Sequence, residues 1–355
     1  MTAALDPDEI VVRWRTLRAF RPTVRTCEAA AELGVTEAEL LASMAGDGAV
    51  RLDANPGDLL YALTEVGRCT AVTRNPGAKS EVRGRYAGIE LGPRAGQVTG
   101  ERFELRVFLD HWRHLFALEQ PDPQRRVARR RSIHVFDRAG AAVHAIYLEP
   151  EGDHRTWDAI VATRATTAPL VLEPAPLRRD LRIDAAIDRA VLLAEWDEMQ
   201  DTHEFFHLLA RYGVTRTQAL RLAGETRARQ VADDAIERVM EAASASGDPL
   251  MIFVGNPGCH QAFSGAIDRV ARHGPWLDVL DPGFNLHLRC DRIASSWVVR
   301  KPTRAGVVSS LELFDSRGEV LALVFRARGD RERPEDAAWR ALLAGLPGWQ
   351  PGAPR

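Results

Sequence analysis

The segment SLELFDSRG at residues 310–318 repeats the segment SIHVFDRAG at residues 132–140, and this pair decides the fold class. In SLELF, apolar and polar residues alternate, which is typical of a half-buried β-strand. Asp and Gly follow in both segments, and they favour a tight turn. The two copies therefore predict the same strand and turn in each half of the chain.

Three further pairs of segments follow at a nearly constant offset of about 180 residues, which indicates an internal repeat. They are WRTLRAFRPTVRTCEAAAELGVTEAEL (14–40) with WDEMQDTHEFFHLLARYGVTRTQAL (196–220), RNPG (74–77) with GNPG (255–258), and FELR (103–106) with FNLH (284–287). The copies meet in residues 166–182, a stretch rich in proline and polar residues that is typical of a linker. We expect two repeats, at residues 1–170 and 183–355.

Each half opens with helical periodicity and continues into short strands separated by turns. In the second half, apolar residues and one histidine recur at three- and four-residue steps, namely Leu192, Trp196, Met199, His203, Phe206 and Ala210. This spacing predicts an apolar stripe on a helix, with His203 inside it. We expect an α+β fold made by tandem duplication, in which each half joins helices to a large antiparallel sheet and the two sheets stack.

The composition excludes several classes of protein. A net charge of -2 provides no basic field for nucleic acid. The first residues lack the pattern of a signal peptide, and no run of about 18 apolar residues is present to span a membrane. The four cysteines are scattered, which indicates neither a disulfide framework nor a cysteine zinc site. We expect a soluble cytoplasmic protein that is not embedded in a membrane.

The segment HEFFH at residues 203–207 matches H-E-x-x-H, the signature of zinc metalloproteases. In a zinc hydrolase, His203 and His207 would bind the metal and Glu204 would be the general base. The longer metzincin pattern requires a glycine and a histidine downstream, where this chain has Ala210 and Gly213. A third ligand is therefore missing from the pattern, and zinc hydrolysis is kept only as a remote alternative.

The repeat provides an internal control for these histidines. When the two GVT segments are aligned, His203 corresponds to Val24 and His207 to Glu28. The fold therefore does not require a histidine at either position. His203 is either a core histidine of the second half or a ligand, and His207 is either a solvent-side residue or a spare ligand.

The second half contains WDEMQDTHEFFHLL, GVTRTQAL, IFVGNPGCHQAFSG, FNLHL, VVRKPTRAGVVSSLELF and VFRARGDRE, and the first half contains RNPG, FELRVFLDHW and IHVFDRAG. In this order, these segments resemble the HemS/ChuS/HmuS/PhuS family of cytoplasmic haemin-binding proteins, also called hemin-degrading factors. The resemblance covers nearly the whole chain, including its duplication.

The resemblance implies a function in iron acquisition. Members bind haem in a cleft between the two sheets, receive it from an inner-membrane haem importer, and store it or pass it to a downstream acceptor or oxygenase. Some members degrade haem with a reductant or peroxide, so a carrier and a haem-degrading enzyme both remain open. Either a monomer or a homodimer fits this function.

The resemblance also implies roles for particular residues. His203 matches the iron ligand, and Arg106 matches an arginine on the opposite side of the haem. The cations that bind the haem propionates match Arg216, Lys301 and Arg328. Phe325 stands where relatives tend to have a tyrosine, so a hydrogen bond to a propionate is absent from that position.

A second haem site in the first half, present in some relatives, is not expected because its ligand position is Ser80.

These residue types suit haem. Iron binds a neutral imidazole, and burial of His203 beside Phe205 and Phe206 would favour that form. Arginine and lysine suit carboxylates. Arg216 corresponds to Glu37 in the first repeat, which marks it as a residue of the site rather than of the fold.

Overall fold

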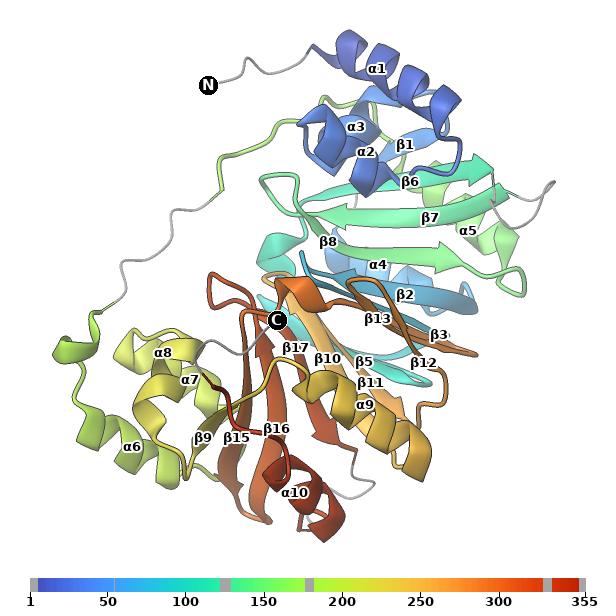
Figure 1. Cartoon of the computed structure of the whole chain (residues 1–355). Helices are drawn as coiled ribbons and strands as arrows, with labels where there is room; N and C mark the ends of the chain where they lie inside the picture. Colours follow the sequence, from blue (N-terminus) through green and yellow to red (C-terminus); the bar gives the residue numbers. More distant parts are fainter. Residues whose placement is uncertain (1–5, 54, 122–128, 176–181, 328–333, 351–355) are drawn as a thin grey trace. The chain divides into compact units, whose positions relative to one another are not determined.

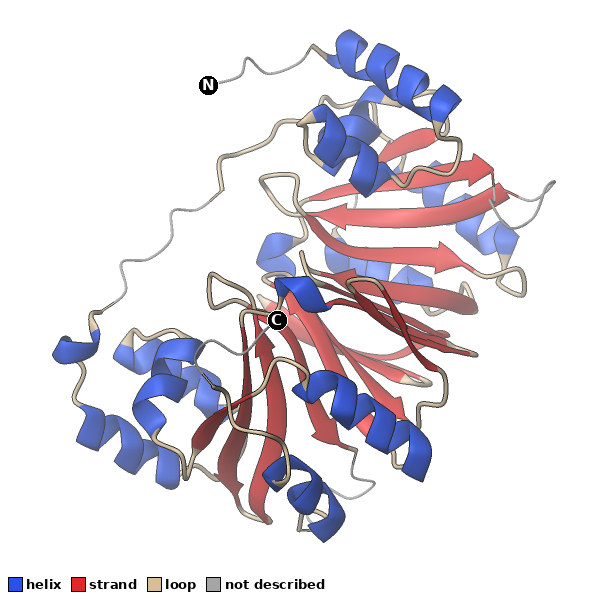
Figure 2. Ribbon diagram, viewed as in Figure 1, coloured by secondary structure: helices blue, strands red, loops and turns tan. Residues whose placement is uncertain are grey.

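The computed structural model describes residues 6–53, 55–121, 129–175, 182–327 and 334–350 (Figure 1). The chain forms two compact units. Unit 1 comprises Met1–Arg74, Glu81–Pro176 and Asn256–Gln261, and unit 2 comprises Asn75–Ser80, Leu177–Gly255 and Ala262–Arg355. Both contain helices and antiparallel strands (Figure 2), so the predicted α+β duplication is confirmed. The repeat boundaries at residues 170 and 183 stay predictions.

Unit 1 begins with helices and continues into antiparallel strands. Its α-helices are α1 (Pro7–Phe20), α2 (Thr26–Leu33), α3 (Glu37–Ser43), α4 (Pro56–Leu63) and α5 (His154–Arg164). Its strands are β1 (Ala49–Leu52), β2 (Arg68–Arg74), β3 (Ala78–Leu91), β4 (Ala95–Gly100), β5 (Phe103–Phe108), β6 (His114–Pro121), β7 (Arg129–Phe136) and β8 (Ala142–Leu148). The strands pair in the orders β1-β6-β7-β8-β2 and β3-β4-β5.

Unit 2 follows the same plan. Its α-helices are α6 (Arg189–Asp197), α7 (Glu204–Tyr212), α8 (Arg216–Ala223), α9 (Ala235–Ser246) and α10 (Ala337–Ala344). Its strands are β9 (Ala228–Val231), β10 (Leu250–Asn256), β11 (Cys259–Gly265), β12 (Val270–His273), β13 (Trp276–Asp281), β14 (Phe284–Arg289), β15 (Ser295–Thr303), β16 (Gly306–Phe314) and β17 (Val320–Arg326). The first residues of two strands belong to the other unit, namely residues 78–80 of β3 to unit 2 and residues 259–261 of β11 to unit 1. The pairing orders β9-β15-β16-β17-β10 and β12-β13-β14 match those of unit 1, so the same arrangement is built twice.

The repeated GVT segments are helix boundaries. Gly34 and Gly213 end α2 and α7 in the left-handed conformation, with φ of 71° and 63°, which glycine adopts without steric cost. The following threonines, Thr36 and Thr215, each begin the next helix with a capping box. The repeat of these letters therefore has a local physical reason in both halves.

The repeated NPG segments are turns in which the asparagine satisfies backbone groups. Asn75 Oδ1 accepts the N–H groups of Gly77 and Ala78, and its Nδ2 donates to Leu321 O at 2.8 Å. Asn256 makes the same two contacts with its own turn, and its Nδ2 donates to Val143 O at 2.8 Å. Each turn is thus fixed in a unit that consists mainly of the other half of the chain, which the sequence did not predict.

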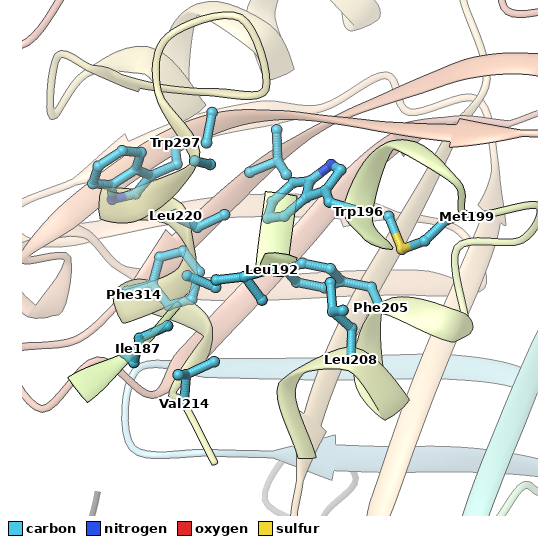
Figure 3. Close-up of a cluster of buried hydrophobic side chains, with 14 residues drawn as sticks. Ile187, Leu192, Trp196, Met199, Phe205, Leu208, Val214, Leu220, Trp297 and Phe314 are labelled. Carbon is cyan, nitrogen blue, oxygen red and sulfur yellow. The ribbon is translucent and has the colours of Figure 1, made fainter. Parts of the chain in front are cut away.

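One face of the unit 2 sheet is covered by α6, α7 and α8 through a buried apolar cluster (Figure 3). Trp196 of α6 and Phe205 of α7 meet edge to face with ring centroids 4.6 Å apart. Trp297 of β15 and Phe314 of β16 belong to the same cluster, so α7 is anchored to the sheet through its buried side. In unit 1, Trp14 lies in the corresponding cluster.

The single helical stripe predicted over residues 192–210 is wrong in its middle part. The helix ends at Asp197 and a new one begins at Glu204. Two side chains bind backbone N–H groups in between, because Asp201 Oδ1 accepts from His203 N at 2.7 Å and Glu204 Oε2 accepts from Gln200 N at 3.0 Å. Such local bonds compete with a continuous helix.

No helix within the described part of the chain is both long enough and apolar enough to span a membrane.

The two capping boxes lead to a matched pair of predictions. Thr36→Ala and Thr215→Ala should each lower the free energy of unfolding by about 1 kcal/mol, because each removes the acceptor for an unpaired helix N–H group. The measurement is urea unfolding followed by circular dichroism. Thr36→Ser and Thr215→Ser keep the hydroxyl and serve as controls, and equal losses in the Ser and Ala variants would contradict the capping role.

Candidate functional site

His203 lies at the start of α7, as the residue that caps its N-terminus. Its side chain is 63% exposed. The expectation that His203 is buried in an apolar stripe is therefore wrong, because the break between α6 and α7 turns this position outward. The imidazole is reachable by a ligand without any movement of the core.

The orientation of His203 is set by Asp201, a residue that sequence reasoning missed. The Nδ1–H group donates to Asp201 Oδ1 at 2.6 Å, since a carboxylate can only accept this bond. The lone pair is then on Nε2, the nitrogen left for a metal ligand bond. The sequence does contain a pattern that indicates this bond. In Asp-Thr-His, the aspartate lies two residues before the histidine and can bind both its backbone N–H group and its ring.

The outward face of α7 combines imidazoles with an aromatic ring. Phe206 is 62% exposed, and His207 is exposed on the same face as His203 because it follows one helical turn later. Phe205 and Leu208 point the other way and are buried. A histidine beside an exposed phenylalanine can bind an apolar ligand that carries a metal.

The zinc alternative gains no support from its surroundings. Among the residues that the structure describes, no group of three or more His, Cys, Asp or Glu side chains is arranged to hold a metal ion. Glu204, the general base of that hypothesis, is exposed and caps the backbone of Gln200.

The sheet face under α7 has an apolar part that is only partly covered. The register places Met251 of β10 opposite Phe325 of β17, and Phe325 opposite Ser310 of β16. Phe325 is half-buried and meets Phe253 edge to face with centroids 5.6 Å apart. These residues share the face that bears Glu312, since side chains alternate along a strand and Glu312 is two residues from Ser310.

Glu312 is the centre of a buried ion cluster. It lies on β16 with no exposed side-chain surface, between Arg216 of α8 and Lys301 of β15. Arg216 donates through Nε and Nη2 to the two carboxylate oxygens at 2.6 and 2.8 Å. Lys301 Nζ donates to Oε1 at 2.6 Å, and the Ser310 hydroxyl donates to the same oxygen at 2.9 Å.

The cluster differs from the expected propionate clamp. Lys301 was predicted to bind a ligand carboxylate, but it is only 2% exposed and is bound to Glu312. Arg216 is 18% exposed and is also bound to Glu312. Glu312 was not predicted, because SSLELF marks only a strand and no spacing connects it to residues 216 and 301.

Burial and charge act in opposite directions on the pKa values of this cluster. Burial lowers the pKa of Lys301 from 10.5 to about 8, against the opposing influence of Glu312. Burial alone would raise the pKa of Glu312, yet Arg216 and Lys301 together bring it well below its ordinary value. Glu312 is therefore an anion at neutral pH, and the cluster carries one net positive charge.

Phe205 connects this cluster to the histidine. The Arg216 guanidinium lies 5.0 Å and the Lys301 ammonium 4.8 Å from the centre of the Phe205 ring. Phe205 is the second residue of α7 and follows His203 by two positions. The same helix turn thus presents the imidazole outward and an aromatic face to two cations.

Unit 1 carries different chemistry at the equivalent positions. Glu37, the counterpart of Arg216, pairs with Arg74 and accepts from Thr26. His134, the counterpart of Glu312, is buried and contacts the Ser132 hydroxyl at 2.9 Å, and burial lowers its pKa to about 4. The repeated fold is shared, but the Arg–Glu–Lys cluster belongs to unit 2.

The remaining predicted residues lie elsewhere. Arg106 is exposed on β5 of unit 1, opposite Gln97 of β4, and its role stays a prediction. Its repeat counterpart, His287, is bound instead to Asp278 at 2.8 Å. Ser80 is fully buried. Arg328 lies outside the described residues.

The chain matches one family model twice, once in each repeat. The model describes a haemin-degrading HemS.ChuX domain and covers residues 34–163 and 213–346. The hemin transport protein HmuS of Yersinia pestis is 37% identical over 330 residues, which are 93% of this chain and 94% of HmuS.

Solved structures give the same result. The holo form of PhuS, a heme-binding protein from Pseudomonas aeruginosa, has a TM-score of 0.93 and 38% identity, covering 97% of this chain and 100% of PhuS. The heme degrading enzyme ChuS of Escherichia coli O157:H7 has a TM-score of 0.89 and 32% identity, covering 96% of this chain and 100% of ChuS.

The lowered pKa of Lys301 predicts a pH dependence of stability. Between about pH 8 and pH 10.5 the folded chain binds fewer protons at this residue than the unfolded chain. The contribution of Lys301 to the free energy of unfolding should therefore rise with pH across this window, by at most about 1 kcal/mol per pH unit.

Urea unfolding of the wild type and of Lys301→Met at several pH values tests this prediction. The wild type should gain stability relative to the variant as the pH rises from 8 towards 10.5. If the difference in free energy of unfolding between the wild type and the variant stays constant with pH, the prediction that burial lowers the pKa of Lys301 is wrong.

Proposed function

The chain belongs to the haemin-degrading HemS.ChuX family, and from this premise we propose that it binds haem as its cargo in iron acquisition. The proposal is carried by one observation: His203 is exposed, with Nδ1 held by Asp201 and Nε2 left for iron. In this proposal His203 is the axial ligand of the haem iron.

The surroundings of His203 support a haem in particular. Phe206 offers an exposed ring on the same helix face, and Met251, Phe253 and Phe325 offer a partly covered apolar surface on the sheet face that also bears Glu312. A flat macrocycle requires such apolar surface, and its carboxylates require cations. Because Phe325 has no hydroxyl, it contributes packing alone.

The charged residues complete the proposed site. Arg216 offers the accessible cation of the buried cluster, and Arg328 is proposed to assist it at a propionate. Arg106 of unit 1 is proposed to act on the side of the haem opposite His203, where an arginine can donate to an oxygen ligand of the iron.

We place the protein in the cytoplasm, between an inner-membrane haem importer and a downstream acceptor or oxygenase. A carrier must both bind and release its cargo.

His203→Ala should weaken hemin binding by at least about tenfold and change the Soret spectrum, because it removes the proposed iron ligand. His207→Ala, on the same exposed face, is the matched control and should keep the wild-type spectrum. The measurement is a spectroscopic titration with hemin. If His203→Ala shows the same Soret shift as the wild type, the haem proposal is wrong.

A haem-degrading enzyme is the second candidate, because ChuS of Escherichia coli is a heme degrading enzyme and 32% identical. We expect little degradation of haem when the hemin-loaded protein is given ascorbate in the presence of catalase, because a carrier does not break down its cargo. The absorbance of bound hemin follows the reaction. Rapid conversion to an open-chain tetrapyrrole would make degradation the main activity.

A further inference from the structure

Glu312 already uses the donor groups that a ligand carboxylate would use. The Nε and Nη2 groups of Arg216 form one of the two-donor edges with which a guanidinium binds a carboxylate, and Glu312 accepts from both at 2.6 and 2.8 Å. Lys301 Nζ donates to the same side chain at 2.6 Å. The two cations predicted for the haem propionates are therefore engaged by a carboxylate of the protein itself.

Access to these cations is unequal. Arg216 is the outer partner at 18% exposed, while Lys301 is 2% and Glu312 0% exposed. Because Lys301 is buried, an incoming carboxylate can reach it only after neighbouring side chains have moved. A carboxylate that reaches Arg216 meets a guanidinium whose Nε–Nη2 edge is occupied by Glu312.

The charge of the cluster limits what it can neutralise. Two cations and one anion leave one positive charge, whereas haem carries two propionates. Arg216 is also the first residue of α8, so its bonds to Glu312 connect the start of this helix to β16.

Resting on the haem binding proposed above, we propose that Glu312 is a built-in competitor of the haem propionates. It holds Arg216 and Lys301 in place in the haem-free chain, and a propionate reaches the Nε–Nη2 edge of Arg216 or the Lys301 ammonium only by sharing or displacing it. The competition weakens the propionate contribution to affinity, which favours release of the haem to an acceptor.

The duplication supports a role for Glu312 beyond the fold. His134 occupies its position in unit 1, and each residue contacts a serine two positions upstream, Ser132 or Ser310. The fold therefore accepts a different side chain at this position of β7 and β16. The carboxylate is present in the repeat that carries Arg216, Lys301 and His203.

The experiment compares hemin with hemin dimethyl ester, whose propionates are esterified and uncharged. The ratio of the two affinities measures the propionate contribution alone, since iron coordination and apolar packing are common to both. Glu312→Gln keeps the shape of the side chain and removes its charge. The control is Glu237→Gln on α9, which changes the net charge of the chain equally and lies 3.8 Å from Arg272.

Glu312→Gln should raise the preference for hemin over its ester by about tenfold relative to the wild type, as expected when a charged hydrogen-bonding edge becomes free for the ligand. Glu237→Gln should leave the preference unchanged. A preference that is unchanged or lower in Glu312→Gln overturns the competitor role. If the wild type does not bind hemin, the proposed function is refuted, and the proposed role of Glu312 as a competitor is refuted as well.

A second variant covers the case in which Glu312→Gln fails to fold with two buried cations and no counter-ion. The double variant Glu312→Gln, Lys301→Met removes one charge of each sign, and such replacement of a buried pair is commonly tolerated. Its cluster has the wild-type net charge, but the two-donor edge of Arg216 is free. Its preference for hemin over the ester should exceed that of Lys301→Met alone, and a preference at or below that of Lys301→Met overturns the proposal.

Discussion

The buried carboxylate of Glu312 is the interaction on which the geometry of unit 2 around the site depends. A fully buried anion is stable only with matched cations, and Glu312 takes them from two different elements, Arg216 from α8 and Lys301 from β15. The first turn of α8 is thereby fixed to the middle of the sheet. Phe205 packs against the same two cations, which fixes the first turn of α7 as well. His203 precedes that turn, so its position also follows from the cluster.

The duplication separates what the fold requires from what the site requires. The glycine and threonine of each GVT segment and the asparagine of each NPG segment have the same backbone partners in both halves, because helix ends and turns impose the same demands wherever they occur. The charged positions differ. Glu37 and His134 replace Arg216 and Glu312 in unit 1, and their contacts form another network. Among the residues that the structure describes, an exposed, oriented histidine and the Arg–Glu–Lys cluster occur together in unit 2 alone.

Several features of the site followed from the pattern of residues. His203 and Arg216 stood out because their repeat counterparts are Val24 and Glu37, residues of different chemistry. The errors concern exposure. His203 was expected inside an apolar stripe, but Asp201 binds backbone and imidazole and interrupts the helix, which turns the ring outward. Lys301 was expected to face a ligand, but it lies inside the cluster.

The sequence by itself determined the duplication, the α+β class and the family, because these depend on local residue patterns and on the order of segments along the chain. Tertiary structure decided which side chains meet. Arg216, Lys301 and Glu312 are far apart in the sequence, and no periodicity connects a helix N-terminus to the centres of two strands. The contacts among these three side chains depend on strand register and on the packing of α7 and α8 against one sheet face. Both result from burial between segments that are distant in the sequence, and not from a local pattern.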